Sequence, residues 1–160
     1  MASAELLRPS AWYLAVALLI AVVSVVPAGH GARAETASVL GTWYTEGRES
    51  QVRLYTCGAE ICGDIVALKN PVRDDGTPLL DTNNKDESLR GRSILGLQIL
   101  GGFQSRDPAR WTDGWGYDPD DGRTYQDVEM EMTGPNELEI GGCILWGAIC
   151  QMQTWERVPQ

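Results

Sequence analysis

The sequence predicts an all-β protein, a single antiparallel up-and-down β-barrel of about eight strands that follows an N-terminal signal helix. From Glu35 onward, apolar residues alternate with a period close to two, which is typical of strands with one buried face. Tight-turn residues separate these runs at short intervals, as in barrels and sandwiches. No amphipathic helix pattern interrupts them, and the 126 residues of this part are enough to bury one core.

Residues 1–34 have the three parts of a secretory signal peptide. A weakly basic start is followed by an apolar run over 11–26, and Ala32 and Ala34 stand at the two positions that a signal peptidase reads. We therefore expect residues 35–160 to be the barrel domain of an exported protein, in the periplasm or outside a bacterial cell. The alternative is an uncleaved membrane anchor, because the apolar run is near the lower limit for spanning a bilayer.

Charge and composition exclude several functions. The chain has 22 acidic and 13 basic residues, a net charge of −9, which repels nucleic acid and anionic lipid. Membrane contact is thus expected only through the signal segment. The single histidine, His30, lies in that segment, so the barrel domain has no histidine for a nucleophilic relay or a metal site. No enzyme activity, cofactor or metal is predicted; acid-rich residues 81–86 and 118–122 are interpreted as turns, with a surface calcium ion as the alternative.

The clearest predicted strand covers residues 123–132, where Val128 and Met130 alternate with acidic residues. Residues 70–92 contain two prolines and several Asp, Asn and Gly residues, so we expect a long connection or a short helical turn. The glycine pair 101–102 should bend or end the strand before it. The predicted strands are 39–45, 50–57, 62–69, 94–100, 114–118, 123–132, 137–144 and 149–158.

The four cysteines fall into two local pairs, and each pair flanks a predicted hairpin turn. Exported proteins keep disulfides, and residues at the base of a hairpin lie within disulfide range. We expect the pairs Cys57–Cys62 and Cys143–Cys150. A four-thiolate zinc site is one alternative, although the spacings lack the usual C-x-x-C. A redox-active pair is another, although no C-x-x-C opens a helix.

Gly41-Thr42-Trp43 near the start of the domain and Trp155-Glu156-Arg157 near its end resemble the lipocalins and other calycin barrels. In those barrels a Gly-x-Trp on the first strand packs at the closed end against an arginine from the last strand. A guanidinium stacked on an indole would close the barrel floor and join its first and last strands. Gly41, Trp43, Trp155 and Arg157 are therefore predicted to be structural; two unrelated core tryptophans are the alternative.

A wider set of short motifs occurs in one order along the chain. They are Gly41-Thr42-Trp43, Cys57-Gly58 with Cys62-Gly63, Asp81 with Asn84 and Leu89-Arg90-Gly91-Arg92, Tyr117-Asp118-Pro119 with Gly122 and Tyr125, and Gln153-Thr154-Trp155 with Arg157. Together they resemble the bacterial exported family catalogued as domain of unknown function 2147, over nearly all of the domain. The resemblance implies an exported, lipocalin-like barrel without an established activity. The chain departs from it at Lys85, where relatives often carry proline.

Four side chains are candidates for binding a ligand. Arg90 and Arg92 could hold a carboxylate or phosphate, and the alternative is that they pair with nearby acids. Trp115 and Tyr117 could grip an apolar or sugar-like ligand, and the alternative is that they pack at the core or rim. We expect a binding module for a small apolar or amphipathic ligand. The alternative is an envelope accessory protein with a filled barrel and no small ligand, which binds a partner protein through its loops.

Overall fold

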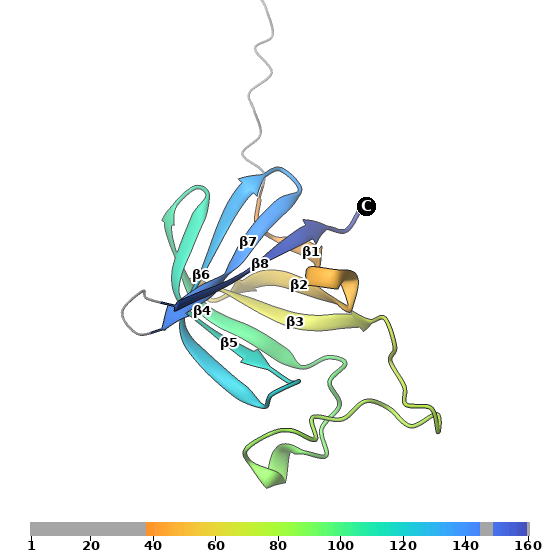
Figure 1. The fold of residues 1–160 in the computed structure, drawn as a ribbon. Coiled ribbons are helices and arrows are strands. Elements are labelled where there is room, and N and C mark those ends of the chain that lie inside the picture. The colour runs from red at the N-terminus through yellow and green to blue at the C-terminus, as the bar shows by residue number, and fades with distance from the viewer. Residues whose placement is uncertain (1–37, 145–148, 160) are drawn as a thin grey trace, which may run out of the picture. The chain divides into compact units, whose positions relative to one another are not determined.

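The structure is a computed structural model that describes residues 38–144 and 149–159 (Figure 1). The expected signal helix in residues 1–34 lies outside this part. Among the described residues, none of the helices is long and apolar enough to cross a membrane. The elements are β1 (Gly41–Tyr44), η1 (Glu46–Arg48), β2 (Ser50–Cys57), β3 (Glu60–Leu68), η2 (Glu87–Leu89), β4 (Gln98–Asp107), β5 (Arg110–Asp118), β6 (Arg123–Gly134), β7 (Glu137–Ile144) and β8 (Ile149–Arg157).

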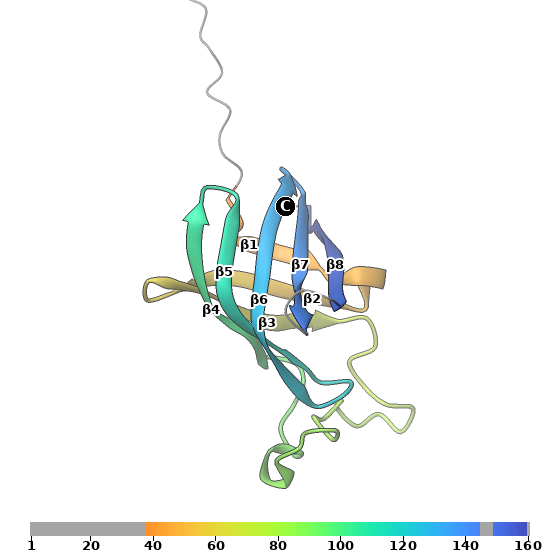
Figure 2. The ribbon, with the colours of Figure 1, turned by 60° about the vertical axis from the view of Figure 1, so that its left-hand side comes forward.

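The eight strands form one closed barrel in chain order, and β8 pairs back onto β1. Every neighbouring pair is antiparallel, so the predicted up-and-down barrel is confirmed. The alternation that predicted the strands marks their two faces. In β6, Val128 and Met130 are buried, whereas Asp127 and Glu131 are exposed. Strands of adjacent sequence therefore lie side by side around the barrel (Figure 2).

The predicted bounds were wrong at the fourth and fifth strands. β4 begins at Gln98 rather than at residue 94 and continues to Asp107, and β5 begins at Arg110. The glycine pair bends β4 without ending it, because Gly102 has a φ of 78° and pairing with β5 continues on both sides. The polar residues after the pair form the exposed tip of a β4–β5 hairpin. Residues 70–92 are a connection with one short helical turn, η2, as predicted.

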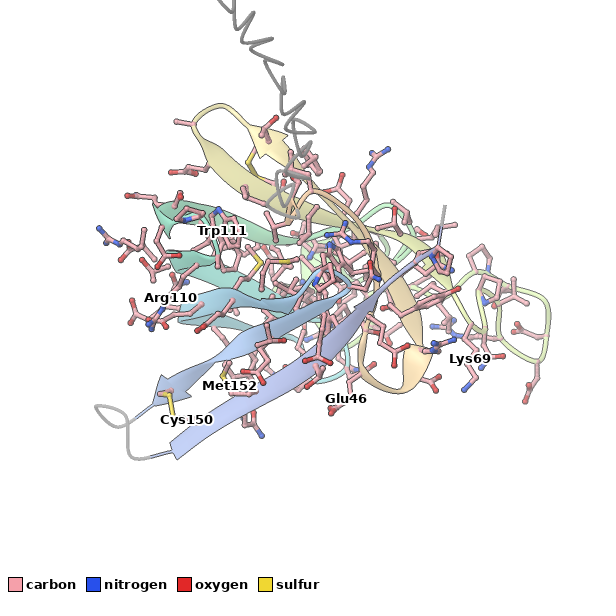
Figure 3. All side chains as sticks on the ribbon, turned by 90° about the horizontal axis from the view of Figure 1, so that it is seen from above. Glu46, Lys69, Arg110, Trp111, Cys150 and Met152 are labelled. Atoms are coloured by element: carbon pink, nitrogen blue, oxygen red, sulfur yellow. A yellow bond between two sulfur atoms is a disulfide. The ribbon has the colours of Figure 1, made fainter. Side chains whose placement is uncertain are left out.

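The first and last strands meet through Trp43 and Arg157, which are register partners (Figure 3 shows the barrel from above). The Arg157 guanidinium carbon lies 4.1 Å from the centroid of the fully buried Trp43 ring. Arg157 Nε, Nη1 and Nη2 donate to the backbone oxygens of Pro135, Leu40 and Ser38 at 3.0, 3.0 and 2.5 Å. This clasp closes the end of the barrel that also holds the β2–β3, β4–β5 and β6–β7 turns, here called the closed end.

Gly41 lies against the same clasp. Its φ is 132°, and a Cβ at this position would lie 2.9 Å from Arg157 Nη1. A residue with a side chain would therefore be strained and would press on the guanidinium. Trp155 is not the ring that Arg157 stacks on: it is buried, its Nε1 donates to Gln153 Oε1 at 2.9 Å, and it pairs with Leu138 on β7.

The four cysteines form two disulfides, Cys57–Cys62 and Cys143–Cys150, and no cysteine is free. The first closes the β2–β3 hairpin. The second joins directly paired residues of β7 and β8. Neither a zinc site nor a dithiol pair can use these sulfurs in this form, because a disulfide sulfur is not a thiolate ligand or nucleophile.

Only part of the barrel interior is filled by side chains. Six apolar side chains of the strands have almost no exposure and pack in the half nearer the closed end. They come from β1, β2, β4, β6 and β7, and they are Trp43, Val52, Leu54, Phe103, Met130 and Leu138. The other half, towards η1 and the β3–β4 and β5–β6 connections, contains a cavity. We call that end of the barrel the open end.

Candidate functional site

The cavity at the open end has a volume of about 790 Å³. Its deeper wall is apolar. Trp155 forms its floor, because it is the register partner of Leu138 in the packed half. The cavity is thus bounded below by closely packed side chains and opens between the connections of the open end. The strands contribute the apolar residues Ile65, Leu68, Ile99, Leu100, Val128 and Ile140 to its wall, and the β3–β4 connection adds Leu79 and Ile94.

The charged side chains at the mouth of this cavity are mostly acidic. Glu46 and Glu49 come from the β1–β2 connection, and Asp118 and Asp120 come from the end of β5 and the following turn. Arg123 is the one cationic side chain that lines the cavity in the described part of the chain. Burial raises the pKa of the Asp118 carboxyl, and the negative charges nearby raise it further, although backbone hydrogen bonds oppose the shift.

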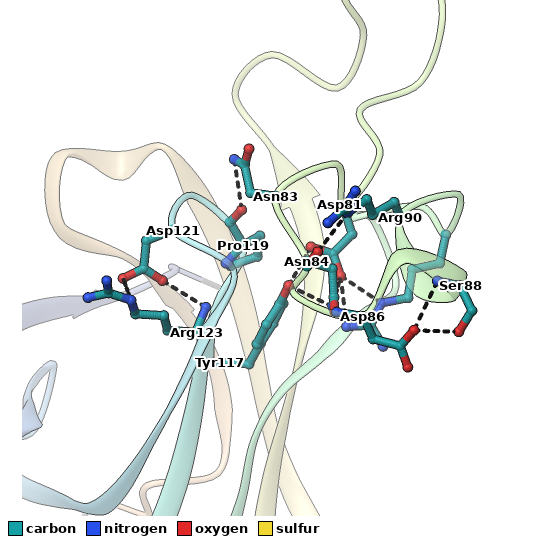
Figure 4. A network of polar contacts seen from close by, with 11 residues as sticks. Asp81, Asn83, Asn84, Asp86, Ser88, Arg90, Tyr117, Pro119, Asp121 and Arg123 are labelled. Atoms are coloured by element: carbon teal, nitrogen blue, oxygen red, sulfur yellow. Dashed lines mark hydrogen bonds and ion pairs between the residues drawn. The ribbon is translucent and has the colours of Figure 1, made fainter.

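Residues 69–97, which connect β3 to β4, pass beside the open end and contact the β5–β6 turn (Figures 1 and 2). They hold one fully buried carboxylate, Asp81 (Figure 4). Tyr117 Oη donates to Asp81 Oδ1 at 2.5 Å, and Asn84 Nδ2 and Arg92 Nε each donate to Asp81 Oδ2 at 2.8 Å. Arg92 also forms an ion pair with it at 2.8 Å. The connection is therefore anchored to β5 by a charged, fully paired group.

Two opposing effects act on the pKa of Asp81. Burial alone raises it, since the charged form loses water. Hydrogen bonds from Tyr117, Asn84 and Arg92, together with the Arg92 charge, outweigh burial, so the pKa lies below its ordinary value. For Tyr117 the same pairing works in the opposite direction: burial and the Asp81 carboxylate raise the pKa of its phenol. The charged form of Asp81 is thus stabilised by one cation, Arg92, and by two neutral donors, Asn84 and Tyr117.

A second contact fixes the same connection to the β5–β6 turn. Asn83 Nδ2 donates to the backbone oxygens of Pro119 and Asp120 at 3.3 and 2.9 Å. Gly122 has a φ of 67°, and a Cβ there would lie 1.9 Å from the backbone oxygen of Asn83. Only glycine allows the two backbones to approach this closely. The turn and the connection therefore pack as one unit.

A separate pocket of about 600 Å³ lies on the outer side of this unit, and we call it the side pocket. Trp115 lines it from the outer face of β5. The two flanking glycines face inward, because a Cβ on Gly114 would meet Phe103 and one on Gly116 would meet Leu100. Tyr117, Arg123 and Tyr125 line both this pocket and the barrel cavity, so they form the wall between the two.

The structure brings together three of the four candidate ligand-binding residues. Arg92, Trp115 and Tyr117 line the side pocket. Arg90 does not: its Nε donates to the backbone oxygen of Asn84 at 2.8 Å, and it pairs with Glu87 at 3.2 Å. This agrees with the alternative of pairing with a nearby acid. Arg92 also pairs with an acid, but with Asp81, eleven residues away, while 36% of its side chain stays exposed.

Sequence reasoning missed the central role of Asp81 and the position of Asp118 inside the mouth. Both belong to motifs that carried the family resemblance, which was the only signal available. The acid-rich turns use their carboxylates locally: Asp86 accepts from Ser88 N at 2.9 Å, and Asp118 accepts from Asp120 N at 2.8 Å. Within the described residues no group of three or more His, Cys, Asp or Glu side chains is placed to hold a metal ion.

A family of proteins described as "Uncharacterized protein conserved in bacteria (DUF2147)" matches residues 41–157. The chain belongs to this family. The match begins at Gly41 and ends at Arg157, so it spans the whole DUF2147 barrel from one side of the clasp to the other. The resemblance inferred from the ordered motifs is thereby confirmed.

Among solved structures, this DUF2147 chain is similar to protein HP1028 from Helicobacter pylori. HP1028 is described as a member of the lipocalin family. The two chains are 22% identical, with a TM-score of 0.65 over 78% of this chain and 85% of HP1028. The likeness confirms a lipocalin-like barrel. No curated protein matches the chain.

Proposed function

We propose that this DUF2147 protein is an exported, non-enzymatic barrel that binds a small apolar or amphipathic molecule in the cavity at its open end. The cavity carries the proposal. Its volume of about 790 Å³ falls in the range of small-molecule sites, which are typically about 300–1,000 Å³. A purely structural barrel would fill this half with side chains, as the other half is filled.

The lining suggests how the ligand would be oriented. An apolar body would lie on the floor at Trp155 and against the wall at Val128 and Ile140. Its polar end would face the mouth, where Glu46, Asp118 and other carboxylates outnumber the single arginine. This arrangement favours a polar end that is uncharged or cationic, because an anionic end would be repelled.

Export is the second part of the proposal. Residues 1–34 would direct the chain out of the cytoplasm and be removed, leaving residues 35–160 in the periplasm or outside the cell. The two disulfides support this, since such bonds persist in oxidising compartments. The test is the N-terminal sequence of protein recovered from the envelope fraction. An N-terminus at Glu35 is expected, and full-length protein in the cytoplasm would contradict export.

The cavity is tested with the uncharged fluorescent probe N-phenyl-1-naphthylamine. The purified protein should bind it, and Val128→Phe should weaken binding at least about tenfold, because the new ring would occupy the cavity. Val66→Phe is the matched control: Val66 is exposed on β3 and does not line the cavity. Circular dichroism checks that both variants fold. Equal affinity of both variants would place the probe outside the cavity.

An accessory envelope protein is the second candidate function. Val72, Leu89 and Leu95 expose 49, 38 and 47% of their surface on the connection between β3 and β4, where a partner protein could contact them. Absence of any probe binding by the folded wild-type protein would favour this function over ligand binding.

A further inference from the structure

The side pocket differs from the barrel cavity in charge, and this difference points to a second ligand. Lys85, Arg92 and Arg123 line it, whereas Asp86 is its single lining carboxylate. Asp86 already accepts hydrogen bonds from the backbone and hydroxyl of Ser88, at 2.9 and 2.7 Å. In a chain of net charge −9, a pocket with three cations is an electrostatic exception.

Two of these cations are available to a ligand. Within the described residues, Lys85 makes no ion pair or hydrogen bond. The Arg123 side chain is 67% exposed, and its Nε lies 4.0 Å from its nearest carboxylate, that of Asp121. Arg92 is held differently: Asp81 lies behind it and pairs with its Nε and Nη2, but part of the guanidinium stays exposed. The pocket therefore presents two available cations beside a third, Arg92, that the buried Asp81 holds in place.

Aromatic rings form the other part of the lining. The Trp115 indole lies over the backbone of Gly101, where an added Cβ would come within 2.7 Å of the ring. Because Gly101 has no side chain, the indole can lie close against the barrel wall. Tyr117 and Tyr125 lie nearby on β5 and β6. Flat aromatic surfaces of this kind pack against ring-shaped ligands that have an apolar face.

Uncommitted polar groups complete the pocket. Gln98 Nε2 donates to the backbone oxygen of Leu100 at 3.1 Å, which leaves its Oε1 as an acceptor. The Thr124 hydroxyl has no hydrogen bond to the described residues and also faces the pocket. These groups suit a ligand with hydroxyl groups rather than a fully apolar one.

We propose that the side pocket binds an acidic sugar, with the sugar ring on Trp115 and its carboxylate at Lys85 and Arg123. The side pocket shares only the wall of Tyr117, Arg123 and Tyr125 with the barrel cavity, so the proposal goes beyond the function proposed above and can fail or hold independently of it. Arg92 would add a further charge-assisted hydrogen bond from its exposed edge. Asp81 and Tyr117 would keep the wall of the pocket in place.

The test uses D-glucuronate as the probe, with D-glucose as the uncharged sugar and cyclohexanecarboxylate as the acid without hydroxyl groups. Binding to the purified protein is measured by saturation-transfer difference NMR of each compound. The Trp115 indole N–H resonance, assigned from Trp115→Phe, reports where the compound binds. Glucuronate should bind most tightly and shift this resonance.

Two double variants locate the charge. K85Q/R123Q removes two positive charges that would face the carboxylate of glucuronate. Together these exposed charges should contribute about tenfold to the affinity, which corresponds to about 1.4 kcal/mol. K69Q/R110Q is the matched control, because it removes the same charge from residues that do not line the pocket (both are labelled in Figure 3). It should leave the affinity within about twofold.

Several results would overturn the proposal. Equal binding of glucose would show that the carboxylate is not recognised, and equal binding of cyclohexanecarboxylate would show that the sugar is not. Equal losses in the two double variants, or an unshifted Trp115 resonance, would remove the ligand from the side pocket. Failure of all three compounds to bind would overturn the site itself, whatever the probe for the barrel cavity shows.

Discussion

The anchor around Asp81 should dominate the stability of the connection between β3 and β4, and Tyr117→Phe tests this with the loss of one oxygen atom. The Tyr117 hydroxyl donates to a fully buried carboxylate at 2.5 Å, and it also accepts a hydrogen bond from Asn84 Nδ2 at 2.9 Å. A hydrogen bond to a charged group contributes about 1.5–3 kcal/mol, and Asp81 keeps its contacts with Asn84 and Arg92. We therefore expect the free energy of unfolding to fall by about 2 kcal/mol.

The control is Tyr55→Phe, which removes the same atom from a less buried pair. Tyr55 Oη donates to Asp64 Oδ1 at 3.0 Å, and both residues are partly exposed. Water can replace this contact, so the loss should stay below about 1 kcal/mol. Urea unfolding followed by tryptophan fluorescence measures both variants. For a domain of this size, about 2 kcal/mol corresponds to roughly 6–10 °C in a thermal melt.

The pH dependence gives an independent check. The pKa of Asp81 is lower in the folded protein than its ordinary value. Its contribution is therefore complete above the unfolded value, about 3.9, and is lost as the pH falls through the folded value. The difference in the free energy of unfolding between wild type and Tyr117→Phe should be full at pH 7 and should narrow as the pH falls below about 4. Equal losses in the two Phe variants, or a gap independent of pH, would refute this account of the anchor.

Two further predictions concern backbone contacts. Arg157→Lys should lower the free energy of unfolding by about 2 kcal/mol despite keeping the charge, because lysine cannot reproduce three hydrogen bonds to the oxygens of Pro135, Leu40 and Ser38; a urea midpoint equal to wild type would contradict the clasp. Gly122→Ala should separate the β5–β6 turn from the β3–β4 connection, because its Cβ would overlap the Asn83 oxygen. Amide hydrogen exchange in residues 70–97 should then quicken at least about tenfold, and unchanged protection would contradict this.

The sequence was informative wherever apolar burial decides the structure. Period-two alternation located the strands, and local cysteine pairs located the two disulfides. The bounds of β4 and β5 were missed because the tip of their hairpin is polar on both faces, so alternation is absent there. Gly102 also reads as a strand end in sequence, although in the barrel its positive φ allows a bend within one continuous strand.

The sequence predicted the candidate sites poorly, because polar contacts rather than apolar burial hold the β3–β4 connection beside them. Asp81 looks like any loop aspartate until β5 places the Tyr117 hydroxyl beside it, and Arg92 has closer acids in sequence than the one it pairs with. Hydrophobic periodicity reports which side chains leave water together, but it carries no information on which donor meets which carboxylate. A buried carboxylate with three donors fixes a connection that has almost no regular structure. The Asp81 carboxylate therefore holds Tyr117, which lines both pockets, in its position. Protonation of Asp81 should make the walls of both pockets more mobile at a higher pH than the one at which the barrel unfolds.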